Sequence, residues 1–166
     1  MRIIISPAKK MNVDTDSFAC HGLPQLLSKT ERLRTRLQAM SCAELKALWK
    51  CSDQLAELNF QRLREMDLRR RLTPAIMAYE GIQYQYMAPG VFSQEQLEYV
   101  EEHLRILSGF YGVLRPFDGV APYRLEMQAR LSVCEVKNLY EFWGTSLAEN
   151  LFSETDCVVN LASREY

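Results

Sequence analysis

The spacing of apolar residues changes along the chain, and the change predicts where strands and helices lie. A short β-branched run from Arg2 to Ser6 ends at Pro7 and predicts a buried strand. The last apolar run, Cys157 to Ala162, predicts a second buried strand. Strands at both ends with helices between them indicate an α+β domain built on a mixed sheet.

Helical spacing dominates from residue 23 to about residue 67, where we expect three helices joined by tight turns. Ser41 and Glu44 form a capping box, in which each side chain satisfies a backbone amide of the other, at the start of the second helix. Ser52 or Asp53 can cap the third. Three such helices are most simply a scaffold.

A second capping box, Ser93 with Gln96, predicts a further helix that ends at Gly109. Its apolar side carries Leu97, Val100, Leu104 and Leu107. Another helix is predicted from Val136 to Leu151. Residues 75–86 are ambiguous. The first part could be a strand that ends at Gly81, and residues 82–86 show alternating aromatic spacing, so the interpretation of this segment stays open.

The length of 166 residues, with 48% hydrophobic and 25% charged types, is typical of a single globular domain covering 1–166. This composition excludes a disordered tail, a disulfide mini-protein and a collagen-like fibre. No apolar run approaches the ~20 residues that cross a bilayer, and the start does not fit a secretory signal. We therefore expect a cytoplasmic protein with no membrane partner. The chain stops at Tyr166, directly after a strand expected to be central, which predicts a fragment.

The net charge of −1 gives no basic signature for the whole chain, but the charges are unevenly distributed. Residues 1–90 carry 14 Lys and Arg against 9 Asp and Glu, whereas residues 91–166 carry 6 against 12. This asymmetry permits a basic face. The five cysteines contain no C-x-x-C pair, so we expect reduced thiols, no metal site and no cofactor.

Two parts of the chain could bind an anion. Lys9 and Lys10 follow the first strand, at the end where ligands collect in open α/β sheets. The stretch from Arg105 to Met127 contains the glycine-framed turn 109–112 and three arginines, Arg105, Arg115 and Arg124. Glycine amides and guanidinium groups both suit a phosphate. The alternatives are a solvated lysine pair and arginines that pair with Asp118 and Glu126.

Five blocks of sequence occur in an order that resembles the YaaA family of bacterial peroxide stress-resistance proteins. They are Ile-Ser-Pro-Ala-Lys ending at Lys9, Leu-Ser-Gly-Phe-Tyr-Gly-Val-Leu-Arg-Pro-Phe-Asp at 107–118, Pro-Tyr-Arg-Leu-Glu-Met at 122–127, Tyr-Glu-Phe-Trp-Gly at 140–144 and Asn-Leu-Ala-Ser-Arg-Glu-Tyr at 160–166. Family members continue past the last block, so the resemblance implies that the carboxyl-terminal part is missing here.

The resemblance also implies a YaaA-like (cantaloupe-type) α/β fold, a basic cleft and a helix-hairpin-helix element that holds the DNA backbone. We place that hairpin at Ser108 to Gly112. The family is associated with lowering free intracellular iron during peroxide stress, which limits oxidative damage. No catalytic residue follows from the motif match.

Three functions are therefore considered: sequence-independent binding of double-stranded DNA, an enzyme acting on a phosphorylated or nucleotide-like small molecule, and direct iron binding. The second would use Glu126 as an acid or base, and for the third the sequence shows no ligand spacing. The candidate DNA- or anion-binding residues are Lys9, Lys10, Arg105, Ser108, Gly109, Tyr111, Gly112, Arg115, Tyr123, Arg124, Asn160 and Ser163.

Overall fold

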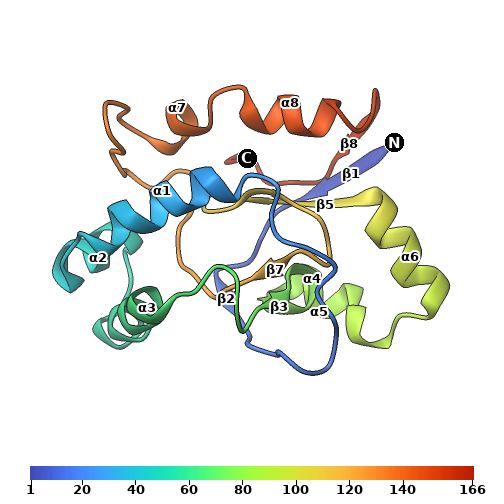
Figure 1. Cartoon of the computed structure of the whole chain (residues 1–166), viewed down its shortest axis with the longest axis horizontal. Coiled ribbons are helices and arrows are strands. Elements are labelled where there is room, and N and C mark those ends of the chain that lie inside the picture. The colour runs from blue at the N-terminus through green and yellow to red at the C-terminus, as the bar shows by residue number, and fades with distance from the viewer.

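A four-stranded sheet in the order β6-β5-β1-β8 organises the structure, a computed structural model that describes residues 1–166 (Figure 1). Its strands are β1 (Arg2–Ile5), β5 (Leu104–Ser108), β6 (Gly112–Leu114) and β8 (Val158–Asn160). β1 pairs in parallel with β5 and β8, whereas β6 is antiparallel to β5. The sheet is mixed, and the α+β prediction is confirmed.

Successive side chains of a strand point to opposite faces of the sheet, and at β1, β5 and β6 both faces are covered by apolar packing. On one side Ile5, Ile106 and Leu114 belong to a core cluster of 31 buried residues. On the other side a small cluster lies against α8 (Ser146–Phe152). Its members are Ile4, Leu107, Val113 and Leu151.

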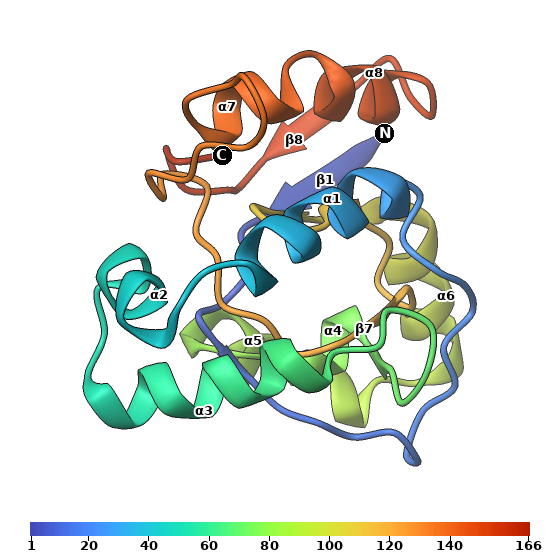
Figure 2. The same cartoon turned by 60° about the vertical axis from the view of Figure 1, so that its left-hand side comes forward.

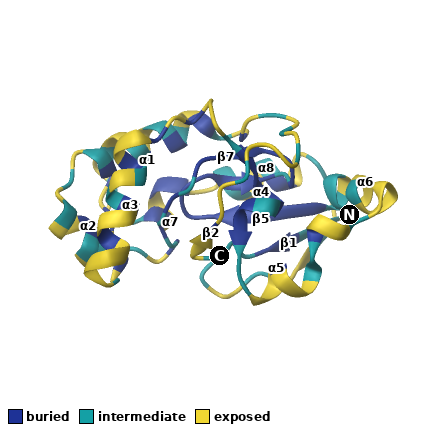
Figure 3. Ribbon diagram, turned by 90° about the horizontal axis from the view of Figure 1, so that it is seen from below, coloured by how far each residue is buried: buried dark blue, intermediate teal, exposed yellow.

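The three helices predicted between residues 23 and 67 are confirmed as α1 (Leu27–Gln38), α2 (Cys42–Trp49) and α3 (Asp53–Glu65). Ser41 and Glu44 form the expected capping box, and Ser52 accepts a hydrogen bond from the Leu55 amide at the start of α3. Figures 1 and 2 show α2 and α3 on the side of the molecule opposite α6 (Gln94–His103). Their outer faces are exposed, whereas β1 and β5 are mostly covered (Figure 3).

Short elements fill the remainder of the chain. The segment whose interpretation stayed open, 75–86, contains α4 (Ala75–Ala78), β4 (Tyr79–Glu80) and most of α5 (Ile82–Met87). Small two-stranded sheets pair β4 with β2 (Lys10–Met11) and β3 (Thr73–Pro74) with β7 (Gly119–Val120). The other elements are the 3-10 helix η1 (Pro89–Val91) and α7 (Leu139–Trp143).

Three sequence-based predictions of the elements are wrong. Helix α6 ends at His103, and Leu104 to Ser108 form β5 because parallel pairing with β1 buries apolar side chains on both faces. The helix expected over 136–151 is divided into α7 and α8 at Gly144, whose φ of 52° interrupts the helix. Strand β8, predicted to be buried and central, lies at an edge of the sheet in this chain, and its residues are half-buried or exposed.

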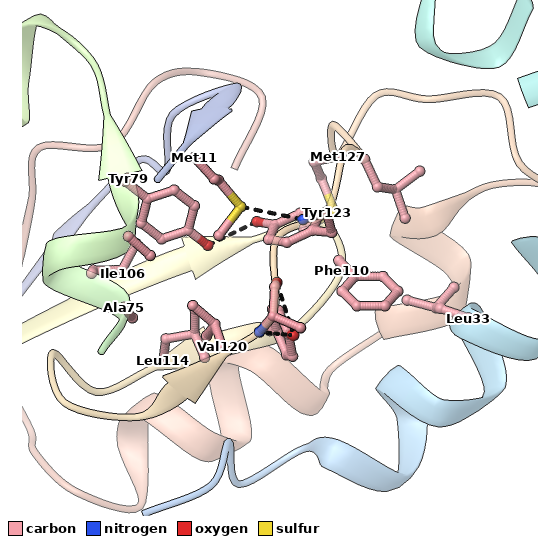
Figure 4. Packing of buried hydrophobic residues seen from close by; sticks show 14 of the residues in the cluster. Met11, Leu33, Ala75, Tyr79, Ile106, Phe110, Leu114, Val120, Tyr123 and Met127 are labelled. Atoms are coloured by element: carbon pink, nitrogen blue, oxygen red, sulfur yellow. Dashed lines mark hydrogen bonds between the residues drawn. The ribbon is translucent and has the colours of Figure 1, made fainter. Parts of the chain in front are cut away.

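The main core surrounds a group of stacked and edge-on aromatic rings (Figure 4). Phe110 stacks on Tyr123 with ring centroids 5.0 Å apart, and Tyr111 meets the edge of the same ring at 5.3 Å. Tyr123 is part of the segment 122–127, so its contacts with Phe110 and Tyr111 attach one of the five sequence blocks to the core. None of the helices has the length and apolar character that crossing a bilayer requires.

Candidate anion-binding cleft

In the segment 123–127, which belongs to no helix or strand, the side chains alternate between the core and the surface. Tyr123, Leu125 and Met127 are buried, while Arg124 and Glu126 are half-buried and face outward. Alternation of this kind follows from the two-residue period of extended backbone. The block Pro-Tyr-Arg-Leu-Glu-Met thus anchors itself with three residues and presents a cation and a carboxylate at the surface.

These two side chains line a hollow of about 280 Å³, which we call the basic cleft. Three other segments contribute to it: the loop after β1, the end of α2 and residues 128–130. Its lining residues are Lys9, Leu48, Trp49, Lys50, Arg124, Glu126, Gln128, Ala129 and Arg130. Four of these side chains are cationic and one is acidic, so the basic cleft carries a clear excess of positive charge.

A smaller pocket of about 90 Å³ shares Lys9, Arg124 and Glu126 with the basic cleft, and we call it the side pocket. Its other wall includes Glu165 and Tyr166, which follow β8. Lys9 follows β1, so residues beyond the carboxyl ends of two neighbouring parallel strands meet here, where open α/β sheets commonly place ligands.

The charges in the side pocket are partly paired. Lys9 Nζ lies 3.0 Å from a carboxylate oxygen of Glu126, although 63% of the lysine side chain remains exposed. Burial, followed by the charge of Glu126, raises the pKa of Glu165. The charge of Lys9 and a hydrogen bond from Ser163 act in the opposite direction without reversing the shift. Glu165 therefore holds its proton to a higher pH than an ordinary carboxyl group does.

Two buried N–H donors of residues lining the basic cleft have no acceptor within the protein. They are Nε of Arg124 and Nε1 of Trp49, whose side chain is 5% exposed. An unpaired buried donor costs about 1–3 kcal/mol. Because four lining side chains are cationic and one is a carboxylate, the lining of the cleft is complementary to an anion with several oxygen atoms.

A buried hydrogen-bond network holds Tyr123 in place (Figure 4). Its hydroxyl lies 2.8 Å from the hydroxyl of Tyr79 and 2.7 Å from that of Ser108, and its amide donates to the sulfur of Met11. Burial raises the pKa of Tyr123 to about 12, so the hydroxyl stays protonated at neutral pH. Tyr123 and Ser108 therefore anchor the segment 123–127 to the core. Neither lines the basic cleft, and Tyr123 contributes only to the wall of the side pocket.

The turn from Ser108 to Gly112 joins the strands β5 and β6, so the prediction of a helix-hairpin-helix here is wrong. Its residues are buried, and the hydroxyl of Tyr111 donates to the carbonyl of Ala121 inside the protein. Gly112 has a φ of 81°, which favours glycine. The carbonyl of Gly109 accepts a hydrogen bond from Trp143. Ser108, Gly109, Tyr111 and Gly112 thus belong to the scaffold.

Arg105 is also enclosed by the protein. It is 4% exposed, its Nε lies 2.9 Å from Glu154, and it donates to the carbonyl oxygens of Glu101 and Leu104. Burial by itself would raise the pKa of Glu154, but the hydrogen bonds and charges of Arg105 and then Arg2 hold that pKa below its ordinary value. The guanidinium of Arg105 is not available to a ligand.

Arg115 and Lys10 lie outside the basic cleft. Arg115 Nε lies 2.9 Å from the buried carboxylate of Asp118, and a second guanidinium nitrogen donates to the carbonyl of Leu23. Lys10 is exposed and pairs with Glu80 of β4. The alternative that the arginines pair with nearby carboxylates describes Arg115. Lys10 is exposed as the solvated-lysine alternative expects, and it also forms an ion pair with Glu80.

Asn160 and Ser163 shape the chain after β8. The side-chain oxygen of Asn160 accepts a hydrogen bond from the Ala162 amide, and the Ser163 amide donates to Ser6 Oγ at 2.7 Å. The second contact ties this segment to the loop after β1. Of the predicted site residues, only Lys9 and Arg124 present cationic groups to the basic cleft.

The sequence reasoning missed Trp49, Lys50 and Arg130. Lys50 ends α2 with a φ of 47°, in the short turn before α3, and Arg130 is exposed just after the third motif block, 122–127. No local pattern places either beside the same hollow as Lys9, because that arrangement depends on how distant segments of the chain pack together. The alternation of residues in 122–127 was the one available signal, since it places Arg124 and Glu126 on a common side.

The whole chain, residues 1–166, matches the family model described as peroxide stress protein YaaA. It belongs to the YaaA family. A UPF0246 protein of Pediococcus pentosaceus is 59% identical over 166 residues, which are 100% of this chain and 66% of that protein. UPF0246 proteins of Agathobacter rectalis and Lachnoclostridium phytofermentans are 56% and 55% identical and are covered to 67% and 65% of their lengths, again with 100% of this chain. The chain thus spans about two thirds of the length of these relatives.

The five blocks that resemble the YaaA family form one connected unit in the structure. Lys9, Arg124 and Glu126 come from the first and third blocks and Glu165 from the fifth, and all four line the side pocket. The hairpin of the second block lies beneath, and Trp143 of the fourth donates to it. With respect to direct iron binding, no three His, Cys, Asp or Glu side chains gather where they could hold a metal ion.

Proposed function

We propose that this YaaA-family protein binds double-stranded DNA through the phosphate backbone, as part of a peroxide stress response that limits free iron and oxidative damage. The observation that carries the proposal is the convergence of Lys9, Lys50, Arg124 and Arg130 on the basic cleft. Cationic side chains bind nucleic acid mainly by releasing condensed counterions from the phosphates. This mode of binding reads no base sequence.

The first test measures how salt affects the binding of two short duplexes with unrelated sequences, by fluorescence anisotropy. Each phosphate that is neutralised contributes about −0.9 to the slope in a plot of log affinity against log salt. Arg130→Gln should weaken both duplexes by roughly tenfold at ~0.1 M salt, because one fewer counterion is released. Arg130 is exposed, so the substitution leaves the core untouched.

Lys10→Gln is the matched control, because Lys10 is an exposed cation that neighbours Lys9 in sequence but lies outside the basic cleft. We expect its affinity to stay close to that of the unaltered protein. Binding that does not depend on salt, or an equal loss in both variants, would contradict the proposal.

A second candidate is an enzyme acting on a phosphorylated or nucleotide-like small molecule. The raised pKa of Glu165, beside the paired carboxylate of Glu126, favours it, because a carboxyl group that keeps its proton can act as a general acid. Turnover of nucleotides or sugar phosphates, followed by product analysis, tests this candidate. Activity that disappears in Glu165→Gln would support it, and activity that survives would exclude this role of Glu165.

A further inference from the structure

The donors of the basic cleft come from separate segments and surround a small volume. Lys9 comes from the loop after β1, Trp49 and Lys50 from the end of α2, and Arg124 and Arg130 from residues 124–130. The volume of about 280 Å³ is below the range typical of sites for drug-sized ligands. A phosphate group with part of one sugar is a better match for this size than a long stretch of backbone.

The charge of the cleft favours a doubly charged ligand. Four cationic side chains face one carboxylate, and Glu126 pairs with only one of the four. A phosphodiester inside a nucleic acid strand has one negative charge and two free oxygens. A phosphate monoester approaches two negative charges at neutral pH and has three free oxygens.

The two unpaired donors of the lining residues also favour a phosphate monoester. Nε of Arg124 and Nε1 of Trp49 are buried without an acceptor, and they come from different segments. The third free oxygen of a monoester supplies an acceptor that a diester lacks. Hydrogen bonds in which the donor or the acceptor is charged are shorter and stronger than neutral ones, and the oxygen of a phosphate monoester is charged.

We infer that the basic cleft binds a terminal phosphate, the monoester dianion at a DNA end or on a free nucleotide, in preference to an internal phosphodiester. This inference rests on the proposed function, because it names the form of phosphate that the same cleft takes. The apolar side of the cleft, formed by Leu48, Trp49 and Ala129, is suited to the single sugar that a terminal phosphate carries.

The experiment compares the same short duplex with 5′-phosphate and with 5′-hydroxyl ends, together with a closed circular plasmid that has no ends. We expect the phosphorylated duplex to bind about tenfold more tightly, as two additional charged hydrogen bonds allow. Thymidine 5′-monophosphate should compete with the phosphorylated duplex, whereas thymidine should not. The competition arm separates a free nucleotide from a DNA end as the source of the phosphate.

Two variants connect the preference to the cleft. Trp49→Phe keeps an aromatic side chain but removes the unpaired N–H. Arg124→Gln removes the charge of the guanidinium. Each substitution should reduce the preference for the phosphorylated duplex several-fold. Lys10→Gln should retain it, and thermal unfolding verifies that all three proteins are folded. A preference that is unchanged in both cleft variants would overturn the assignment to this cleft.

The outcomes separate this inference from the proposed function. Equal affinity for phosphorylated and hydroxyl ends, with salt-dependent binding of the plasmid, overturns the inference and leaves the proposed function standing. A different result would overturn the proposed function: the protein binds no duplex and no plasmid, but it binds an immobilised nucleotide 5′-phosphate, and thymidine 5′-monophosphate competes for that binding. This result supports the inference for a free nucleotide.

Discussion

Gly109→Ala is expected to lower the free energy of unfolding by about 3 kcal/mol, the upper part of the range for overpacked interiors. A Cβ at Gly109 would lie 2.9 Å from the carbonyl oxygen of Leu125 and 2.9 Å from the amide nitrogen of Met127. Both contacts are with backbone, which cannot move aside as a flexible side chain can. The segment 123–127 would have to shift, and with it Arg124 and Glu126.

Urea denaturation followed by tryptophan fluorescence measures this loss, because Trp143 donates to the Gly109 carbonyl. Gly90→Ala is the matched control, since a Cβ at Gly90 would meet no atom within 4 Å. We expect its stability to stay within about 0.5 kcal/mol of the unaltered protein. Equal stability of the two variants would show that Gly109 does not press against the segment that carries the cleft.

Local signals in the sequence were sufficient for the elements whose formation depends on neighbouring residues. The capping box at Ser41 and Glu44 and the Ser52 cap are satisfied within one helical turn, so a short window of sequence defines them. The strand at Arg2–Ile5 is equally local, because its β-branched run ends at a proline. These predictions needed no knowledge of distant contacts.

The errors concern residues whose state depends on a partner far along the chain. Leu104 and Leu107 fit a helical face, but β1 lies about one hundred residues earlier and pairs in parallel with the strand Leu104–Ser108 that contains them. Such pairing buries both faces and removes the alternation that would mark a strand in the sequence. The expected helix end at Gly109 is for this reason the turn of a β-hairpin.

Only part of the candidate site was predicted from the sequence, because the rest of it also depends on contacts between distant residues. Lys9 and Arg124 could be found because one follows a strand and the other faces outward from an alternating segment. Arg105 carries the same charge, but Glu154 lies 49 residues away and neutralises it in the interior. Residue type gives the chemistry that is available, whereas only the packing decides whether a cation is free or paired.

Arg115→Ala separates a structural arginine from a ligand-binding one, and we expect it to lower the free energy of unfolding by about 3 kcal/mol at neutral pH. Asp118 is 1% exposed and accepts hydrogen bonds from the amide and from the Nε of Arg115. Removing the guanidinium leaves a buried carboxylate without its cation. DNA affinity of the folded protein should not change, because Arg115 does not line the basic cleft.

The pH dependence of this loss identifies its cause. Burial raises the pKa of Asp118 above 3.8, even though the hydrogen bonds and charge of Arg115 act to lower it. A carboxyl group with a raised pKa in the folded state lowers stability as pH rises through the interval from 3.8 to the folded value. Without Arg115 that interval extends to higher pH, so the difference between the variant and the unaltered protein should be small in acid and grow toward neutral pH.

Arg69→Ala is the matched control, because Arg69 forms an exposed ion pair with Glu31, and exposed pairs contribute about 0–1 kcal/mol. Denaturant melts of the three proteins at several pH values, with anisotropy titrations of a duplex at neutral pH, give both readouts. If folded Arg115→Ala loses DNA affinity while its stability is unchanged, Arg115 contributes to DNA binding, and this prediction is contradicted. A stability loss that grows with pH, with unchanged affinity, would assign Arg115 to the support of Asp118 and leave phosphate binding to the cations that the fold keeps accessible.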